Sequence, residues 1–269
     1  MEEKAYNFTY RNIYIHFYKY EGGPKKLICF HGFGQQASDL KNLAARLAEH
    51  YTIYSIDLFY HGKSSWPDCE KALTKGFWNE LFNAFLTYNR IDQYSLCGYS
   101  LGGKIVLSIL ESTVKSPKEV LLIAPDGIQT NLWYSLATYP YWMKRTFKYA
   151  VQHPGFYHRF SKILQATGIL DKGIIKFANN QMSTETKRKK VYCTWLVYRK
   201  LKPDLVKVVE NQRNKNIPVK VFLGKYDRMI NQKKIEAFLS TLSQHKLTIL
   251  PKGHNTLISD VAEYEGNIF

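Results

Sequence analysis

The sequence predicts an α/β fold, with a mostly parallel central sheet, helices on both of its faces and an inserted helical lid. Three observations support this prediction. Short apolar runs typical of buried strands alternate with helical patterns along most of the chain, and such alternation gives a parallel sheet covered on both sides. A serine flanked by glycines stands between one such strand and the next helix, at residues 98–102. Residues 126–200 interrupt the alternation, and this stretch is too long and too apolar for a structureless loop.

The elements follow from local patterns in chain order. Residues 6–20 alternate aromatic and polar side chains around Arg11-Asn12, which predicts an antiparallel hairpin at the sheet edge. Buried-strand patterns then predict strands near residues 26–30, 52–57, 93–97, 119–124, 218–223 and 246–250. Helical patterns separate them at residues 40–49, 77–89, 103–111 and 233–243.

Length and composition predict one sizeable core. The chain has 269 residues, of which 45% are apolar and 22% charged, as in an ordinary single-domain protein. We expect residues 1–125 and 206–269 to form the core domain and residues 126–205 to form the lid. The acidic start, Met1-Glu2-Glu3-Lys4, is unlike a signal peptide. The four cysteines show no metal or redox spacing, so we expect reduced thiols in a cytoplasmic protein.

The most informative motif is Gly98-Tyr99-Ser100-Leu101-Gly102. A G-x-S-x-G sequence between a strand and a helix is typical of a nucleophile elbow, in which a tight turn exposes the serine. The glycines are needed because strand and helix approach closely on both sides of the turn. The motif therefore predicts Ser100 as a nucleophile above the sheet edge.

A serine nucleophile needs a base and an acid that orients the base. His254 follows the predicted strand at 246–250, and Asp227 follows the one at 218–223. Loops after parallel strands meet at one edge of the sheet, so we expect these side chains to lie close to Ser100. Asp126 also follows a strand and is an alternative acid, although it stands where the lid begins.

An oxyanion hole is predicted in His31-Gly32-Phe33-Gly34, which leaves the strand at 26–30. The glycines allow the backbone amide of Phe33 to point toward a substrate oxygen, and the amide of Leu101 is the second expected donor. We expect His31 to hold this loop by hydrogen bonds to nearby backbone rather than to act as a second base.

Together these segments resemble the α/β-hydrolase fold superfamily, of the lidded serine esterase type. The resemblance covers roughly residues 25–125 and 216–258. One matching segment, residues 57–64, departs from the usual pattern because Phe59-Tyr60 stand where the family has Pro-Gly. The resemblance implies that this segment shapes the wall of the pocket, so the departure bears on specificity.

The predicted activity is hydrolysis of a carboxylic ester or thioester through an acyl-enzyme on Ser100, with His254 as base and then acid. No metal or organic cofactor is required. Serine at the elbow argues against the dehalogenase and epoxide-hydrolase branches, whose nucleophile is aspartate. Two alternatives remain: a carbon–carbon bond hydrolase or lyase with the same triad, and a non-catalytic homologue that binds a small ligand. A complete triad argues against the binding protein.

The predicted lid is basic and aromatic. Residues 126–200 hold thirteen Lys/Arg against three Asp/Glu, or +10 of the chain's net charge of +16, and fourteen of its 40 aromatic residues. We expect the aromatic residues to line an apolar acyl pocket. The basic run Lys187-Arg188-Lys189-Lys190 is open to two interpretations. It is either an ordinary solvated basic surface or, by analogy at the level of the fold, a site for an acidic carrier protein. No nucleic-acid motif is visible, and no run approaches the length of a membrane span.

Overall fold

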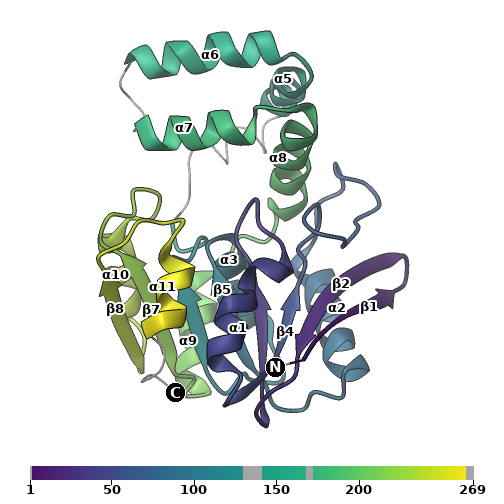
Figure 1. The fold of residues 1–269 in the computed structure, drawn as a ribbon, viewed down its shortest axis with the longest axis vertical. Coiled ribbons are helices and arrows are strands. Elements are labelled where there is room, and N and C mark those ends of the chain that lie inside the picture. The colour runs from purple at the N-terminus through teal and green to yellow at the C-terminus, as the bar shows by residue number, and fades with distance from the viewer. Residues whose placement is uncertain (1, 130–140, 168–171, 265–269) are drawn as a thin grey trace. The chain divides into compact units, whose positions relative to one another are not determined.

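A computed structural model describes residues 2–129, 141–167 and 172–264. Within these ranges the sheet has eight strands in the order β1-β2-β4-β3-β5-β6-β7-β8 (Figure 1). The strands are β1 Glu3–Tyr10, β2 Ile13–Tyr20, β3 Lys25–Phe30, β4 Tyr51–Ile56, β5 Ser95–Tyr99, β6 Val120–Ile123, β7 Val219–Gly224 and β8 His245–Leu250. The β1–β2 and β2–β4 pairs are antiparallel and all other pairs are parallel. The mostly parallel sheet and its edge hairpin are therefore confirmed.

The helices of the α/β unit lie between these strands in the chain, except for α11, which follows the last strand. They are the short helix η1 Ala37–Leu40, α1 Lys41–Leu47, α2 Lys75–Tyr88, α3 Leu101–Ser112, α9 Leu205–Asn214, α10 Gln232–Leu239 and α11 Leu257–Tyr264. The helical patterns in the sequence did not indicate α9 or α11. The apolar signal of α9 is weak because it buries two of its ten residues, Val208 and Gln212.

Both faces of the sheet are covered by helices. Alternate residues of a strand point to opposite faces, and β3 shows this clearly. Leu27 and Cys29 belong to a buried cluster that includes residues of α1 and α11. Phe30, on the opposite face, lies with its ring 5.9 Å from that of Trp78 and 6.4 Å from that of Phe82, both in α2. The core therefore lies on both sides of the central strands.

The chain divides into two compact units. The first comprises residues 1–67, 74–129 and 201–269, and the second comprises residues 68–73 and 130–200. The second unit thus takes in a short segment, 68–73, that sequence analysis placed in the core domain. Residues 130–140 and 168–171 of the predicted lid lie outside the described residues.

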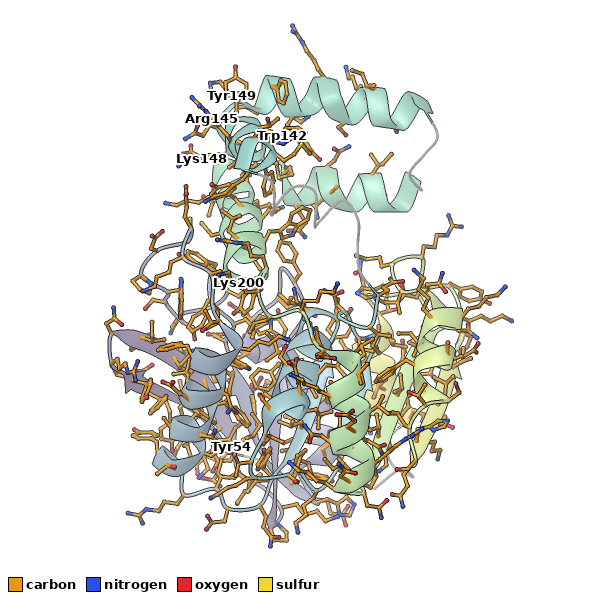
Figure 2. The ribbon with its side chains drawn as sticks, turned by 180° about the vertical axis from the view of Figure 1, so that it is seen from behind. Tyr54, Trp142, Arg145, Lys148, Tyr149 and Lys200 are labelled. Atoms are coloured by element: carbon orange, nitrogen blue, oxygen red, sulfur yellow. The ribbon has the colours of Figure 1, made fainter. Side chains whose placement is uncertain are left out.

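The second unit consists of helices and the non-helical segment 68–73 in its described part. Its helices are α5 Tyr141–Gln152, α6 Pro154–Thr167, α7 Lys172–Gln181 and α8 Glu185–Tyr198. Contacts join α5 to α6 and α8, and α7 to α6 and α8. Glu70 of the 68–73 segment binds Lys144 at 2.8 Å and Lys148 at 2.7 Å, both on α5, where Figure 2 labels Lys148. These two ion pairs attach the segment to the helices. No helix in the described ranges is long and apolar enough to cross a membrane.

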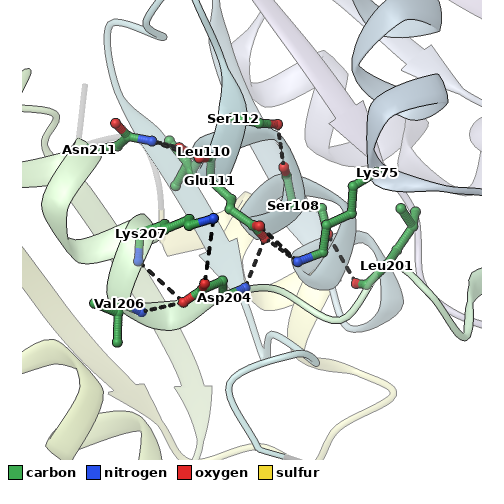
Figure 3. Close-up of polar contacts among 10 residues, drawn as sticks. All are labelled: Lys75, Ser108, Leu110, Glu111, Ser112, Leu201, Asp204, Val206, Lys207 and Asn211. Atoms are coloured by element: carbon green, nitrogen blue, oxygen red, sulfur yellow. Dashed lines mark hydrogen bonds and ion pairs between the residues drawn. The ribbon is translucent and has the colours of Figure 1, made fainter.

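The C-terminal end of α3 is fixed by a buried carboxylate (Figure 3). Glu111 accepts hydrogen bonds from Lys75 Nζ at 2.7 and 2.8 Å and from the Asp204 amide at 2.8 Å. Asn211 Nδ2 donates to the carbonyls of Leu110 and Glu111 at 3.0 and 2.8 Å. These bonds connect α3 to the start of α2 and to both the start and the C-terminal half of α9. The helix that follows Ser100 is therefore anchored at its far end.

Candidate active site

Ser100 occupies the turn between β5 and α3 with φ 49° and ψ −113°. This conformation is unfavourable for a residue with a side chain. It is held by backbone bonds on both sides, because the Ser100 amide donates to the Ile123 carbonyl at 2.9 Å and its carbonyl accepts from the Gly103 and Asp126 amides at 2.8 and 2.9 Å. The strained turn is thus fixed to β6 and to the loop that follows it.

The glycines of the motif are required by close packing. A Cβ at Gly98 would lie 2.5 Å from the Gly102 carbonyl oxygen, and a Cβ at Gly102 would lie 2.0 Å from the Phe30 carbonyl oxygen. Both distances are far below van der Waals contact, and the opposing atoms are backbone. The geometry is that expected of a nucleophile elbow.

His254 lies between Ser100 and Asp227. Its Nε2 is 3.0 Å from Ser100 Oγ, and its Nδ1 is 2.6 Å from Asp227 Oδ2. The histidine side chain is 10% exposed and the aspartate side chain 2%. Asp227 is 27 positions and Ser100 is 154 positions from His254 in the sequence. The three side chains nevertheless form one continuous chain of hydrogen bonds.

Asp227 is held in place by the loop that carries it. Its Oδ1 accepts hydrogen bonds from the amides of Met229 at 2.8 Å and Ile230 at 3.1 Å, which leaves Oδ2 to face His254. The carboxylate accepts a hydrogen bond from the Nδ1–H group of His254, so the proton stays on Nδ1. Nε2 then carries a lone pair and accepts a hydrogen bond from the Ser100 hydroxyl. This is the tautomer that general-base catalysis requires.

Asp126, the alternative acid, has a different environment. Its Oδ1 accepts a hydrogen bond from the Gly127 amide at 2.7 Å. Burial lowers the pKa of the Lys104 ammonium on α3, and the negative charge of Asp126 acts in the opposite direction. The structure therefore brings Asp227 to His254 and places Asp126 near Lys104.

Two buried histidines hold the predicted oxyanion loop. His31 Nε2 accepts from the Leu58 amide at 3.0 Å, and its Nδ1 lies 2.8 Å from the Gly32 carbonyl oxygen. His61 Nε2 accepts from the Gly34 amide at 3.0 Å, and its Nδ1 lies 3.1 Å from the Phe59 carbonyl oxygen. Each ring accepts one N–H bond and faces a carbonyl with its other nitrogen, so both rings are neutral with a proton on Nδ1.

The two expected oxyanion donors are the backbone amides of Phe33 and Leu101. Phe33 stands between Gly32 and Gly34, which are both fixed by hydrogen bonds to side chains. Leu101 is the first residue of α3, and amides in the first turn of a helix have no carbonyl partner within it. The sequence prediction gave His31 a loop-holding role, and its two backbone contacts match that role. His61 was not predicted to take part.

Tyr99 is a further residue of the site that sequence analysis missed. Its hydroxyl donates to the His254 carbonyl at 2.7 Å, and the two rings lie 5.5 Å apart. Burial raises the pKa of the Tyr99 phenol, and the charge of Asp227 adds to this effect. Tyr99 stands at a variable position of the G-x-S-x-G motif, so the pattern alone gave no signal. It is a positioning residue for the histidine loop.

The segment that departs from the family pattern has an unusual backbone. Tyr60 has φ 63°, in the left-handed region that favours glycine, and this explains why glycine is usual at its position. The Tyr60 hydroxyl donates to the Trp66 carbonyl at 3.0 Å. A side chain that anchors itself within the loop therefore replaces glycine here.

The same segment is fixed at its start by a buried carboxylate. Asp57 accepts from the amides of Ala37 at 2.7 Å and Lys63 at 2.9 Å, and its Oδ2 lies 2.8 Å from His16 Nδ1. A Cβ at Gly62 would lie 2.0 Å from this carboxylate. Asp57 and His16 are both 2% exposed. The loop that carries His61 is thus held from its first residue.

Comparison with known proteins identifies the family of the chain. A family model described as the alpha/beta hydrolase fold matches residues 25–261. The uncharacterized hydrolase YugF of Bacillus subtilis is 27% identical over 125 residues, which are 45% of this chain and 44% of that protein. The chain spans less than half the length of the curated relatives it matches.

Solved structures show the same fold. A thermophilic esterase from Thermogutta terrifontis has a TM-score of 0.68 at 15% identity, with 98% of this chain and 96% of that chain covered. The thioesterase domain from the curacin biosynthetic pathway has a TM-score of 0.63 at 17% identity, with 98% and 97% covered. With the family match extending over most of the sequence, the chain belongs to the α/β-hydrolase fold family.

Proposed function

We propose that this protein is a serine hydrolase that cleaves a carboxylic ester or thioester through an acyl-enzyme on Ser100. The observation that carries the proposal is the hydrogen-bonded chain from Ser100 through His254 to Asp227. A histidine ring held by a buried carboxylate on one nitrogen and bonded to a serine hydroxyl on the other is arranged for proton transfer.

The reaction follows from this arrangement. Ser100 Oγ attacks the acyl carbon while its proton passes to His254 Nε2, and Asp227 stabilises the imidazolium. The tetrahedral intermediate collapses as His254 protonates the leaving alcohol or thiol, and the acyl group remains on Ser100. A water molecule, deprotonated by His254, then attacks the acyl-enzyme. His254 returns this proton to Ser100 Oγ as the carboxylic acid leaves.

The negative oxygen of the intermediate would be held by the backbone amides of Phe33 and Leu101. Removing one such donor typically costs about 3 kcal/mol of transition-state stabilisation. The loop that carries Phe33 is fixed through His31 and His61, whose neutral rings accept the Leu58 and Gly34 amides. Donors held in position before the substrate binds lose little energy to reorganisation during the reaction.

We propose an ester or thioester substrate because a serine nucleophile with a histidine base can attack either acyl group, and because solved structures of both kinds of enzyme resemble this chain. The esterase and thioesterase structures named above share the fold. We further propose that aromatic residues of the second unit, which we expect to act as a lid, line an apolar pocket for the acyl chain. A carbon–carbon bond hydrolase or a non-catalytic binding protein with the same three residues would give a different result in the experiment below.

A carrier-bound thioester is a second candidate substrate, based on the excess of cations in the second unit. The basic run that suggested it is only partly available. Arg188 is 8% exposed and donates to the carbonyls of Val151 and Met182 at 2.8 and 3.3 Å. Lys187 Nζ contacts the side chain and carbonyl of Asn180. Lys189 is exposed and is the best placed member of the run to meet an acidic partner.

The decisive experiment combines covalent labelling with a substrate panel. The wild-type protein should react with a fluorophosphonate probe and hydrolyse p-nitrophenyl esters and matched acyl thioesters of increasing chain length. The Ser100→Ala variant should lose both reactions and keep its fold. Ser112→Ala, which alters an exposed serine at the end of α3, is the matched control and should keep both.

Three outcomes would contradict the proposal. Labelling that survives in Ser100→Ala would exclude this serine as the nucleophile. Labelling of Ser100 without hydrolysis of any ester or thioester would favour the carbon–carbon bond alternative. A folded protein that neither reacts with the probe nor hydrolyses any substrate would favour the binding protein.

A further inference from the structure

Large apolar side chains are exposed on the two consecutive helices α5 and α6 of the second unit. Trp142 is 68% exposed, Tyr149 49%, Phe156 42% and Ile163 62%. Scattered exposed apolar residues are normal on proteins, but a contiguous group indicates an interaction surface.

The spacing places these residues along one side of each helix. Trp142, Arg145 and Tyr149 follow one another at i, i+3 and i+7 on α5, which is one face of an α-helix. Phe156, Arg159 and Ile163 have the same spacing on α6. Each helix thus presents a stripe in which a basic residue stands between two apolar ones.

Ring contacts join the two stripes at the corner between the helices. The ring of Tyr149 stacks on that of His153 with centroids 3.8 Å apart, and it meets the ring of Phe156 at 5.4 Å in a T-shaped contact. Figure 2 labels Trp142, Arg145 and Tyr149 where they project from α5. We call the two stripes and the rings that join them the α5–α6 face, and include the exposed Lys162 next to Ile163. The face consists of Trp142, Arg145, Tyr149, His153, Phe156, Arg159, Lys162 and Ile163.

The charge of these helices has one sign. Residues 141–167 contain five Lys/Arg and no Asp/Glu. Glu70, from the 68–73 segment, pairs with Lys144 and Lys148. Arg145, Arg159 and Lys162 are exposed, and none of them forms an ion pair within the described ranges. These three cations of the α5–α6 face are therefore available to an anionic partner.

We propose that the α5–α6 face docks on the surface of an anionic lipid bilayer. Trp and Tyr rings favour the headgroup region, where an apolar ring and its polar atom are both accommodated. Arg and Lys extend beside them to lipid phosphates, and each basic residue adds attraction to an anionic leaflet. Helices with interspersed aromatic and basic residues bind membranes in this way without crossing them.

A bilayer fits this surface better than an acidic protein does. Burial of the four apolar side chains against a protein would also desolvate the cations between them, and each would need an acidic partner at a fixed position. Lipid headgroups are mobile and can adjust to each cation. The mixture of apolar and basic residues thus favours a fluid anionic surface.

The test is sedimentation with lipid vesicles, and it needs no catalytic activity. Wild-type protein should bind vesicles of phosphatidylcholine with 30% phosphatidylglycerol and should bind pure phosphatidylcholine vesicles far more weakly. Arg145→Glu/Arg159→Glu/Lys162→Glu should lower partitioning onto the anionic vesicles at least about tenfold. Lys202→Glu/Lys233→Glu/Lys234→Glu changes the net charge equally at exposed sites of the first unit and should bind nearly as the wild type does.

A second measurement tests the orientation of the face. Brominated acyl chains should quench part of the tryptophan fluorescence of the wild type, and the quenched part should be absent in Trp142→Phe. Equal loss of binding in the two triple variants would reduce the effect to net charge and overturn the proposal. Absence of vesicle binding, or salt-sensitive binding to an acidic carrier protein alone, would also overturn it. Because binding is equally measurable with Ser100→Ala, its outcome is independent of the proposed hydrolytic function.

Discussion

Asp227→Asn would change the tautomer of His254 while leaving the shape of the site intact. Asp227 Oδ1 accepts the Met229 and Ile230 amides at 2.8 and 3.1 Å, so an asparagine must keep its carbonyl oxygen at that position. Its NH2 group then replaces Oδ2, 2.6 Å from His254 Nδ1. Two donors cannot face each other, and therefore Nδ1 becomes the acceptor and the proton moves to Nε2.

A histidine with its proton on Nε2 cannot accept the hydroxyl proton of Ser100. The equivalent change in a serine protease triad lowers kcat by about 10⁴, and we expect a loss of that order here with little change in KM. Hydrolysis of a p-nitrophenyl ester measures both constants, and thermal unfolding checks that the fold is kept. The loss should be in kcat because the change does not alter the substrate-binding surfaces.

The control is Asp126→Asn, an identical substitution in the loop after β6. Asp126 faces the Gly127 amide and the charge of Lys104, so its replacement should leave kcat within about tenfold of the wild type. The reasoning would be refuted if Asp227→Asn kept more than a tenth of wild-type kcat. It would be reversed if Asp126→Asn were the variant that lost activity.

Three further predictions concern side chains whose hydrogen bonds or ion pairs hold neighbouring segments together. Tyr99→Phe removes the hydrogen bond to the His254 carbonyl. It should lower kcat in ester hydrolysis and lower the free energy of unfolding in urea by about 1 kcal/mol. An unchanged kcat would reject the positioning role. Glu111→Ala leaves Lys75 without its buried carboxylate partner and should cost about 1–3 kcal/mol in urea unfolding, whereas a neutral result would show that α3 needs no such anchor. Lys144 and Lys148 lower the pKa of Glu70 to about 2. The wild type should therefore be more stable than Glu70→Gln above pH 4.5, and this difference in stability should disappear as the pH falls toward 2. Thermal melts in which the difference between the two proteins does not depend on pH would contradict this.

The positions of Ser100, Asp227 and His254 could be expected from the sequence because each follows a strand pattern. Parallel strands end at one edge of a sheet, so loops far apart in the chain meet there. The glycines at 98 and 102 added a steric reason that the structure bears out in the short distances to backbone oxygens. Local sequence patterns therefore predict the position of a side chain where they determine the backbone around it, as the strand patterns and the two glycines do here.

Other parts of the molecule could not be predicted in this way. The bonds of Tyr99 and His61 join residues 155 and 27 positions apart, and neither residue belongs to a motif that requires it. The run of basic residues at 187–190 predicts an exposed basic surface, yet Arg188 is buried and donates to the carbonyls of Val151 and Met182. Such contacts depend on how helices pack, and a run of like charges does not reveal which of its members point inward.

Tyr60 shows how the departure from the family pattern bears on the site. A non-glycine residue at φ 63° is strained, and the hydroxyl bond to the Trp66 carbonyl offsets part of that strain. The next residue, His61, accepts the Gly34 amide at 3.0 Å and so fixes the loop that carries Phe33. A change at position 60 is therefore expected to act, through His61, on the loop predicted to hold the oxyanion, while the bonds among Ser100, His254 and Asp227 involve other loops. The segment that departs from the family pattern and the hydrogen-bonded chain from Ser100 to Asp227 thus lie on separate loops, so a change in the first need not disturb the second.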